Sequence, residues 1–185
     1  MERHPDRKNK VLIPAELTEC FEPIVGHPVT LRPLQPEDHG IEHAFVSGLS
    51  PETRHNRLLG GAKRITPEYI DSLITVDFSR DMAIAATVLL EGHEALIGVA
   101  RYVLDPSARA CEFALVIADA WQRRGIGRRM MEKLIALARS RGLQQIYGDV
   151  LSTNSRMLDF CRRLGFALGR NPDDATVTRV TLLLN

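Results

Sequence analysis

The stretch that decides the fold runs from Leu115 to Gly142 and reads LVIADAWQRRGIGRRMMEKLIALARSRG. An apolar strand over residues 113–117 leads into it, because β-branched and aromatic residues dominate that run. After a polar turn, apolar residues recur at the spacing of one helix face: Ile126, Met130, Leu134, Leu137 and Ala138. Gly142 follows the last periodic residue, where a glycine commonly ends a helix. The stretch therefore predicts a strand, a glycine-containing loop and a helix.

The loop has the features of an anion site. The first amides of a helix lack intrahelical partners and lie at the positive end of the helix dipole. Gly125 and Gly127 carry no Cβ that would hold a phosphate away from the backbone. Between Trp121 and Arg141 one acidic residue stands against seven basic ones: Arg123, Arg124, Arg128, Arg129, Lys133, Arg139 and Arg141. A phosphorylated cofactor fits this pattern, and a merely solvated basic helix is the alternative.

Two common phosphate-binding motifs do not fit the spacing. A P-loop needs GK[ST] where this chain has Gly127-Arg128, and a dinucleotide-binding loop needs a third glycine that is missing here. Residues 122–127 instead resemble the [QR]xxGx[GA] loop of the GCN5-related N-acetyltransferase (GNAT) family. The resemblance implies that acetyl-CoA is the cosubstrate, with its pyrophosphate on the loop amides and its pantetheine arm on the preceding strand. The implied cofactor-binding residues are Leu115, Val116, Ile117, Gln122, Arg123, Arg124, Gly125, Ile126, Gly127, Arg128 and Asn154.

A second motif agrees with the first. Residues 150–166, VLSTNSRMLDFCRRLGF, resemble the family pattern NxxAxxxYxxxGF. Asn154 is expected to cap a helix and to reach the cofactor, although an ordinary N-cap is the simpler interpretation. Cys161 stands where many family members have the tyrosine that protonates the leaving CoA thiolate. Because a thiol is a weak donor and a buried one is commonly inert, we expect no acid role for Cys161.

The remaining sequence fits one α/β (α+β) domain. With 185 residues and 44% hydrophobic content, the chain is long enough for one substantial core. The GNAT resemblance implies a mixed, mostly antiparallel sheet of about seven strands flanked by helices, with a splay after the strand that precedes the cofactor loop. We expect residues 1–17 to be a flexible tail, residues 18–185 to be the domain, and residues 56–65 to be a mobile loop. Ser50 and Thr66 are predicted helix caps.

Composition limits the partners and the compartment. The net charge of +1 gives no global field for nucleic acid, and no apolar run is long enough to span a membrane. Three widely spaced cysteines and the lack of a signal-peptide pattern indicate a cytoplasmic protein. His39 and His43 have ligand spacing but no third ligand nearby, so we expect no metal site. A monomer or a homodimer is compatible with the sequence.

The acceptor and the chemistry follow from a narrower resemblance. Residues 31–38 (LRPLQPED), 45–52 (FVSGLSPE), 77–83 (DFSRDMA) and 111–114 (CEFA) resemble the acetyltransferase domain of bacterial protein lysine acetyltransferases. The resemblance implies transfer of acetyl to a protein lysine, with Glu112 as the catalytic general base; a carboxylate on an apolar strand suits that role because burial raises its pKa. An acetyltransferase of small-molecule amines and a non-catalytic acyl-CoA sensor are the alternatives. For Glu112 itself, the alternative to the catalytic role is a solvated position on the open face of the sheet.

Overall fold

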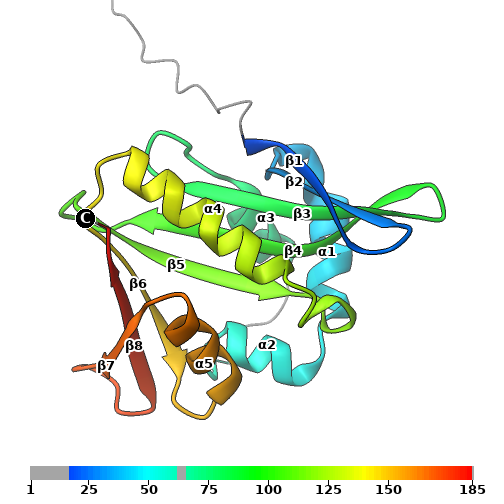
Figure 1. Ribbon diagram of the computed structural model, residues 1–185. Coiled ribbons are helices and arrows are strands. Elements are labelled where there is room, and N and C mark those ends of the chain that lie inside the picture. Colours follow the sequence, from blue (N-terminus) through cyan, green and yellow to red (C-terminus); the bar gives the residue numbers. More distant parts are fainter. Residues whose placement is uncertain (1–16, 62–65, 185) are drawn as a thin grey trace, which may run out of the picture.

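The computed structural model describes residues 17–61 and 66–184, and their strands form one eight-stranded sheet (Figure 1). The strands are β1 (Glu19–Ile24), β2 (His27–Pro33), β3 (Met82–Leu90), β4 (His93–Leu104), β5 (Ala110–Ile117), β6 (Gln145–Leu151), β7 (Ala167–Arg170) and β8 (Val177–Leu183). Their order across the sheet is β1-β2-β3-β4-β5-β6-β8-β7. The sheet is mixed and mostly antiparallel, as expected, and a hairpin lies at each end of it.

Helices cover both faces of this sheet (Figure 1). They are α1 (His39–Gly48), α2 (Pro51–Arg57), α3 (Pro67–Ile74), α4 (Ile126–Ser140) and α5 (Ser155–Arg163), with short 3-10 turns η2 (Pro36–Asp38) and η3 (Asp119–Trp121). The apolar stripe of α4 is buried against β3, β4 and β5, as its helical spacing predicts. α1 and α3 pack on the opposite face, around Phe45 and Ile70. A groove lies where β5 and β6 diverge, beside the start of α4.

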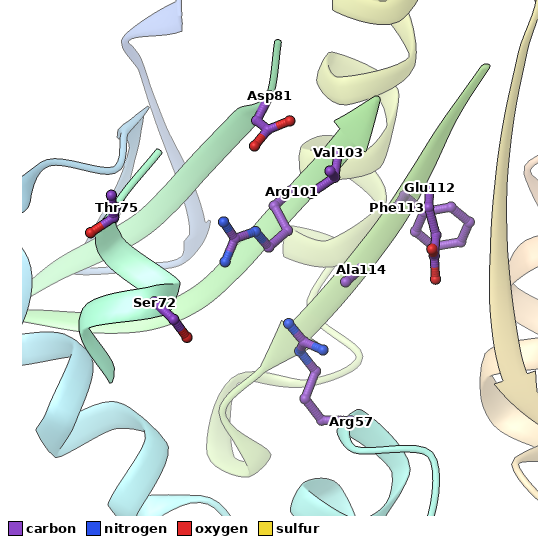
Figure 2. Close-up of a pocket in the computed structure, with 9 residues that line it drawn as sticks. All are labelled: Arg57, Ser72, Thr75, Asp81, Arg101, Val103, Glu112, Phe113 and Ala114. Atoms are coloured by element: carbon purple, nitrogen blue, oxygen red, sulfur yellow. The ribbon is translucent and has the colours of Figure 1, made fainter. Parts of the chain in front are cut away.

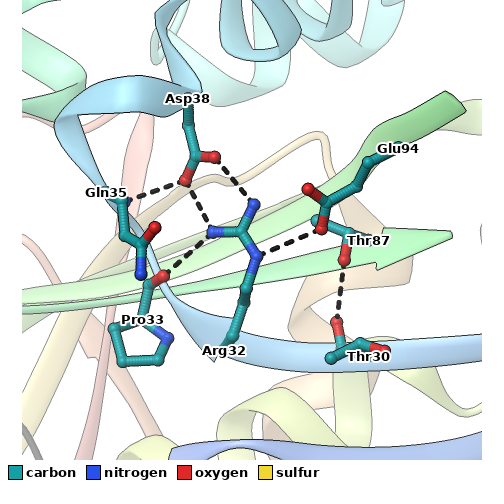
Figure 3. Close-up of polar contacts among 7 residues, drawn as sticks. All are labelled: Thr30, Arg32, Pro33, Gln35, Asp38, Thr87 and Glu94. Carbon is teal, nitrogen blue, oxygen red and sulfur yellow. Dashed lines mark hydrogen bonds and ion pairs between the residues drawn. The ribbon is translucent and has the colours of Figure 1, made fainter.

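Local polar contacts fix the turn that follows β2 (Figure 3). The Arg32 guanidinium forms a two-pronged ion pair with Asp38, at 2.8 and 2.7 Å, and a further one with Glu94 on β4 at 3.1 Å. Asp38 also accepts a hydrogen bond of 2.8 Å from the Gln35 amide. The two carboxylates raise the pKa of Arg32, so its charge is retained although the side chain is largely buried. This cluster positions α1 against the sheet.

The two predicted caps are present. Ser50 Oγ accepts from the Thr53 amide, and Thr66 Oγ1 accepts from the Tyr69 amide, each at 3.2 Å. Asp119 accepts from the Ser50 amide at 3.0 Å and from the Thr53 hydroxyl at 2.7 Å. These bonds tie the start of α2 to the turn that leads into the glycine loop.

Two segment boundaries differ from the expectation. Asn56 and Arg57 belong to the last turn of α2 rather than to a loop, and residues 62–65 of the expected loop lie outside the described residues. Leu17 is 1% exposed and lies in the core, whereas the rest of the expected tail, residues 1–16, lies outside the described residues. The folded domain therefore includes Leu17, because this leucine has a buried apolar site to fill.

The expected splay lies between β5 and β6. These are the parallel pair of the sheet, and they are paired at three positions, which end with Glu112 opposite Tyr147. The next residue, Phe113, lays its ring over Gly148, where an added Cβ would lie 2.8 Å from the ring. A larger residue at Gly148 would push the ring away, so this glycine lets the strands diverge without leaving a void. Beyond Glu112, the edge of β5 faces a groove instead of a neighbouring strand.

Candidate active site

The glycine loop begins α4 with an open helix terminus. Gly125 is the N-cap and has φ 81°, a left-handed conformation that favours glycine, and a Cβ added there would meet no atom within 4 Å. No side chain of the described chain caps this end of α4 by a hydrogen bond. The first amides of a long helix are therefore left without a side-chain partner, as an anion site requires.

Neighbouring side chains hold the loop in this shape. Gln122 Nε2 donates to the Ile117 carbonyl at 3.1 Å, which joins the loop to the end of β5. Arg124 donates from Nε to the Ala120 carbonyl at 3.0 Å, and its guanidinium carbon lies 5.8 Å from the centre of the Trp121 ring. Arg124 thus lies along the loop itself rather than along the groove wall.

A groove of about 760 Å³ runs from the splay to the loop. Nine of the eleven predicted cofactor residues line it: Leu115, Val116, Ile117, Gln122, Arg123, Gly125, Gly127, Arg128 and Asn154. The other two are Arg124, described above, and Ile126, whose side chain is 1% exposed and belongs to the core. Only the backbone of Ile126 is thus available to a ligand in the groove.

Sequence reasoning missed three cations of this groove: Arg57 of α2, and the pair Arg156 and Arg163. The pair lies on α5, where the sequence shows only an ordinary amphipathic helix. The tertiary fold brings α5 to the groove that the glycine loop also lines, and no local pattern could indicate that. Asn154 caps α5 as predicted, since its Oδ1 accepts from the Met157 amide at 3.1 Å. This bond uses the oxygen, so the Asn154 side-chain amide group has donors left for a ligand.

Cys161 lies away from the groove. Its side chain is completely buried in the core, and desolvation raises the pKa of the thiol to about 12. Phe160, the preceding residue, lines the groove instead. The position that the family motif gives to a tyrosine hydroxyl therefore offers no exposed donor here.

A second cavity of about 420 Å³ adjoins the groove (Figure 2). We call it the acceptor cavity; it is lined by Arg57, Ser72, Thr75, Asp81, Arg101, Val103, Glu112, Phe113 and Ala114. Four of these residues also line the groove: Arg57, Glu112, Phe113 and Ala114. Glu112 therefore lies where the two spaces meet.

The position of Glu112 follows from strand alternation. Glu112 pairs with Val103 of β4, and Ala114 pairs with Arg101, so these four side chains share the face that carries α1 and α3. Strand alternation places Val116 on this face as well. Glu112 forms no hydrogen bond or ion pair within the described part of the chain, and its carboxylate is exposed to the cavities.

Electrostatics make Glu112 a stronger base than an ordinary carboxylate. Partial burial raises the pKa of Glu112, and the nearby charge of Asp149 raises it further. Arg179 and Arg57 act in the opposite direction but do not reverse the shift. Asp149 also lines the groove, a role the sequence did not indicate because Asp149 lies on β6 with no local motif.

Asp149 is itself held in place by a polar network. Arg179 of β8 forms an ion pair with Asp149, with one contact of 3.0 Å, and the Asn171 side-chain amide donates to it at 3.1 Å. The Arg179 guanidinium lies 4.8 Å from the centre of the Tyr147 ring, and Tyr147 is the residue opposite Glu112 on the neighbouring strand. The second carboxylate near Glu112 is therefore held in a fixed position.

Comparison with known proteins identifies the family that this geometry belongs to. A model of the acetyltransferase (GNAT) family matches residues 61–166 of the chain. The chain belongs to the GNAT family. It is therefore an acetyl-CoA-dependent N-acetyltransferase, and GNAT enzymes act on an acceptor amine.

Relatives and solved structures agree with this assignment. This GNAT chain is 39% identical over 151 residues to acetyltransferase PA5475 of Pseudomonas aeruginosa, a match that covers 82% of this chain and 81% of the relative. The crystal structure of the GNAT domain of S. lividans PAT is similar with a TM-score of 0.80 at 24% identity, and the match covers 92% of this chain and 99% of that one. An acetyltransferase from Thermus thermophilus is similar with a TM-score of 0.66 at 25% identity, over 84% of this chain and 97% of that one. The fold is thus the GNAT fold.

Two further observations concern other site types. Within residues 17–61 and 66–184, no group of three or more His, Cys, Asp or Glu side chains is arranged to hold a metal ion. His39 forms an ion-pair contact of 3.2 Å with Asp71, and both side chains are exposed. None of the helices in the described part of the chain is long and apolar enough to cross a membrane.

Proposed function

We propose that this enzyme transfers acetyl from acetyl-CoA to a primary amine by direct attack, with Glu112 as the general base. The observation that carries the proposal is the position of Glu112 between the groove and the acceptor cavity. A base must lie within reach of the amine at the moment the amine meets the thioester. A carboxylate at the junction of the two spaces meets that requirement.

The cofactor is proposed to lie along the groove. Its pyrophosphate would accept hydrogen bonds from the amides of residues 122–127, with Arg123, Arg124 and Arg128 supplying positive charge. The pantetheine arm would run along the backbone of residues 115–117, and Asn154 would contribute its side-chain amide. The uncapped start of α4 and the unpaired edge of β5 support this placement.

The chemistry requires one proton transfer to the protein. An alkylammonium has a pKa of about 10.4, so the amine loses its proton before it can attack. Glu112 takes that proton directly or through water, and its raised pKa makes it a better acceptor. The nitrogen then bonds to the acetyl carbon and gives its second proton to solvent. The carbon–sulfur bond breaks, and CoA leaves as a thiolate that takes a proton from solvent.

The acceptor has two candidates. The resemblance to bacterial protein lysine acetyltransferases favours a protein lysine ε-amine. The lining of the acceptor cavity favours a small amine, because it is rich in polar and charged side chains, two of which have a buried polar atom without a hydrogen-bond partner. Three free cysteines, two of them buried, support the cytoplasm as the compartment, where a monomer or a homodimer would act.

An assay of acetyl-CoA turnover tests the proposal against a sensor that binds acyl-CoA without reaction. The purified chain is incubated with acetyl-CoA and a panel of folded proteins, lysine peptides and small amines, and the released CoA thiol is measured. We expect acceptor-dependent release that rises with pH as Glu112 ionises. Tight acetyl-CoA binding without release for every member of the panel would favour the sensor.

A further inference from the structure

Two arginines and two carboxylates line the acceptor cavity. Arg57, from the end of α2, and Arg101, from β4, both extend their guanidinium groups into it (Figure 2). The other charged residues that line it are Asp81 and Glu112. Among the described residues, neither arginine forms an ion pair with either carboxylate.

Arg101 is the more confined of the two. One of its terminal nitrogens donates to the Leu73 carbonyl at 3.1 Å, but its Nε is buried and has no hydrogen-bond partner. Burial lowers the pKa of Arg101, and the neighbouring charge of Arg57 lowers it further. A guanidinium carries five donors, and leaving such a charge desolvated and unpaired is strongly unfavourable.

The acidic groups near Arg101 compensate only in part for the burial of its charge. Asp81 and Glu42 both interact favourably with Arg101 through space, yet each has a buried carboxylate oxygen without a partner. Burial raises the pKa of Glu42 to about 7, so Glu42 is only partly ionised at neutral pH. Arg57 makes no hydrogen bond or ion pair within the described chain. Two adjacent guanidinium groups therefore remain available to a ligand anion.

The strand register sets the distance between this anion site and the base. Glu112 is opposite Val103, and Arg101 is two residues from Val103 on the same strand. Arg101 and Glu112 are thus diagonal neighbours on one face of the sheet, about 7–8 Å apart at the backbone. A molecule that meets both side chains needs an anionic group and an amine only a few bonds apart.

We propose that the acceptor is a small amine that carries a carboxylate, an amino-acid-like molecule. Its carboxylate binds between Arg101 and Arg57, and its amine points to Glu112. A carboxylate suits this site because its two oxygens match the planar fork of a guanidinium. The cavity of about 420 Å³ lies in the range of small-molecule sites. This inference rests on the proposed function, whose acceptor class it names.

Matched ligand pairs test the inference. Each of glycine, alanine, lysine, glutamate and 4-aminobutyrate is compared with its carboxamide counterpart, by calorimetric binding to the CoA-saturated enzyme and by acetyl transfer. We expect at least one carboxylate form to bind about tenfold or more tightly than its carboxamide, as for a charge-assisted bidentate pair. Equal binding of both forms for every pair, or no binding by any member of the panel, would overturn the inference.

Variants assign the preference to the cavity. Arg101→Gln should abolish the discrimination, whereas Arg80→Gln, which removes an exposed arginine outside the cavity, should keep it. Arg57→Gln, which removes the second arginine of the cavity, gives a further test if Arg101→Gln does not fold. Retained discrimination in folded Arg57→Gln and Arg101→Gln would refute the assignment.

Failure of the inference and failure of the proposed function have different signatures. Efficient acetylation of internal lysine peptides, without use of any amino acid, refutes the carboxylate acceptor but leaves Glu112 catalysis intact. Carboxylate-selective binding that depends on Arg101, without acetyl transfer to any acceptor, supports the anion site and refutes the proposed reaction.

Discussion

Replacing Glu112 with glutamine tests its proposed role as a base separately from any structural role. Glutamine keeps the shape of the side chain and removes its ability to take a proton at neutral pH. Glu112 is exposed and makes no hydrogen bond or ion pair in the described part of the chain, so the fold does not depend on its charge. We expect the free energy of unfolding to change by less than about 0.5 kcal/mol.

The rate should change far more than the stability. Loss of a general base lowers kcat by roughly 10²–10⁴-fold, which corresponds to about 3–5 kcal/mol of lost transition-state stabilisation. The affinity for acetyl-CoA should remain within about twofold, since the helix terminus and the groove arginines are unchanged. Burial and Asp149 raise the pKa of Glu112, and the proposed mechanism uses the ionised form as the base. The rate of the native enzyme should therefore fall as pH drops through that raised pKa.

The assay measures release of the CoA thiol with a chromogenic disulfide across a pH series, together with calorimetric binding of acetyl-CoA. Glu37→Gln is the matched control, because Glu37 is an exposed glutamate of η2 that lines neither cavity. We expect the control to keep the native rate and the native pH profile. Native turnover by Glu112→Gln at neutral pH would refute the reasoning and leave Glu112 as a surface residue.

Three further predictions concern the cofactor, the second carboxylate and the thiol. Gly127→Glu should abolish CoA binding, because the new carboxylate enters the groove. The variant should still fold, because a Cβ at this position meets only ordinary contacts of 3.4 to 4.0 Å. Calorimetry should show native CoA binding for the control Gly40→Glu, which adds the same group at an open helical position elsewhere. Asp149→Asn should lower the pKa of Glu112 by removing a like charge, which moves the acidic limb of kcat/KM to lower pH, and an unmoved limb would contradict the coupling. Cys161→Ala should keep most of the turnover and lose only about 1 kcal/mol of stability through a small cavity, and a large rate loss that grows with pH would instead identify Cys161 as the acid.

Much of the scaffold could be predicted from local sequence. The strand, loop and helix around Gly125 follow from a change of apolar period from two to 3.6, which is a property of the chain itself. Caps such as Ser50 and Asn154 are equally local, since each accepts from an amide three residues away. The loop motif of the family indicated the cosubstrate, because all the backbone amides expected to bind the pyrophosphate lie within six consecutive residues.

Tertiary structure alone decided what surrounds the reacting groups. Arg57, Arg101 and Asp149 come from three separate elements, and no spacing in the sequence relates them to Glu112. Strand register brings Arg101 beside Glu112, and the divergence of β5 and β6 opens the space that Asp149 faces. The physical reason is that burial and charge coupling depend on distances through space, which the chain acquires only when its long-range strand pairs form.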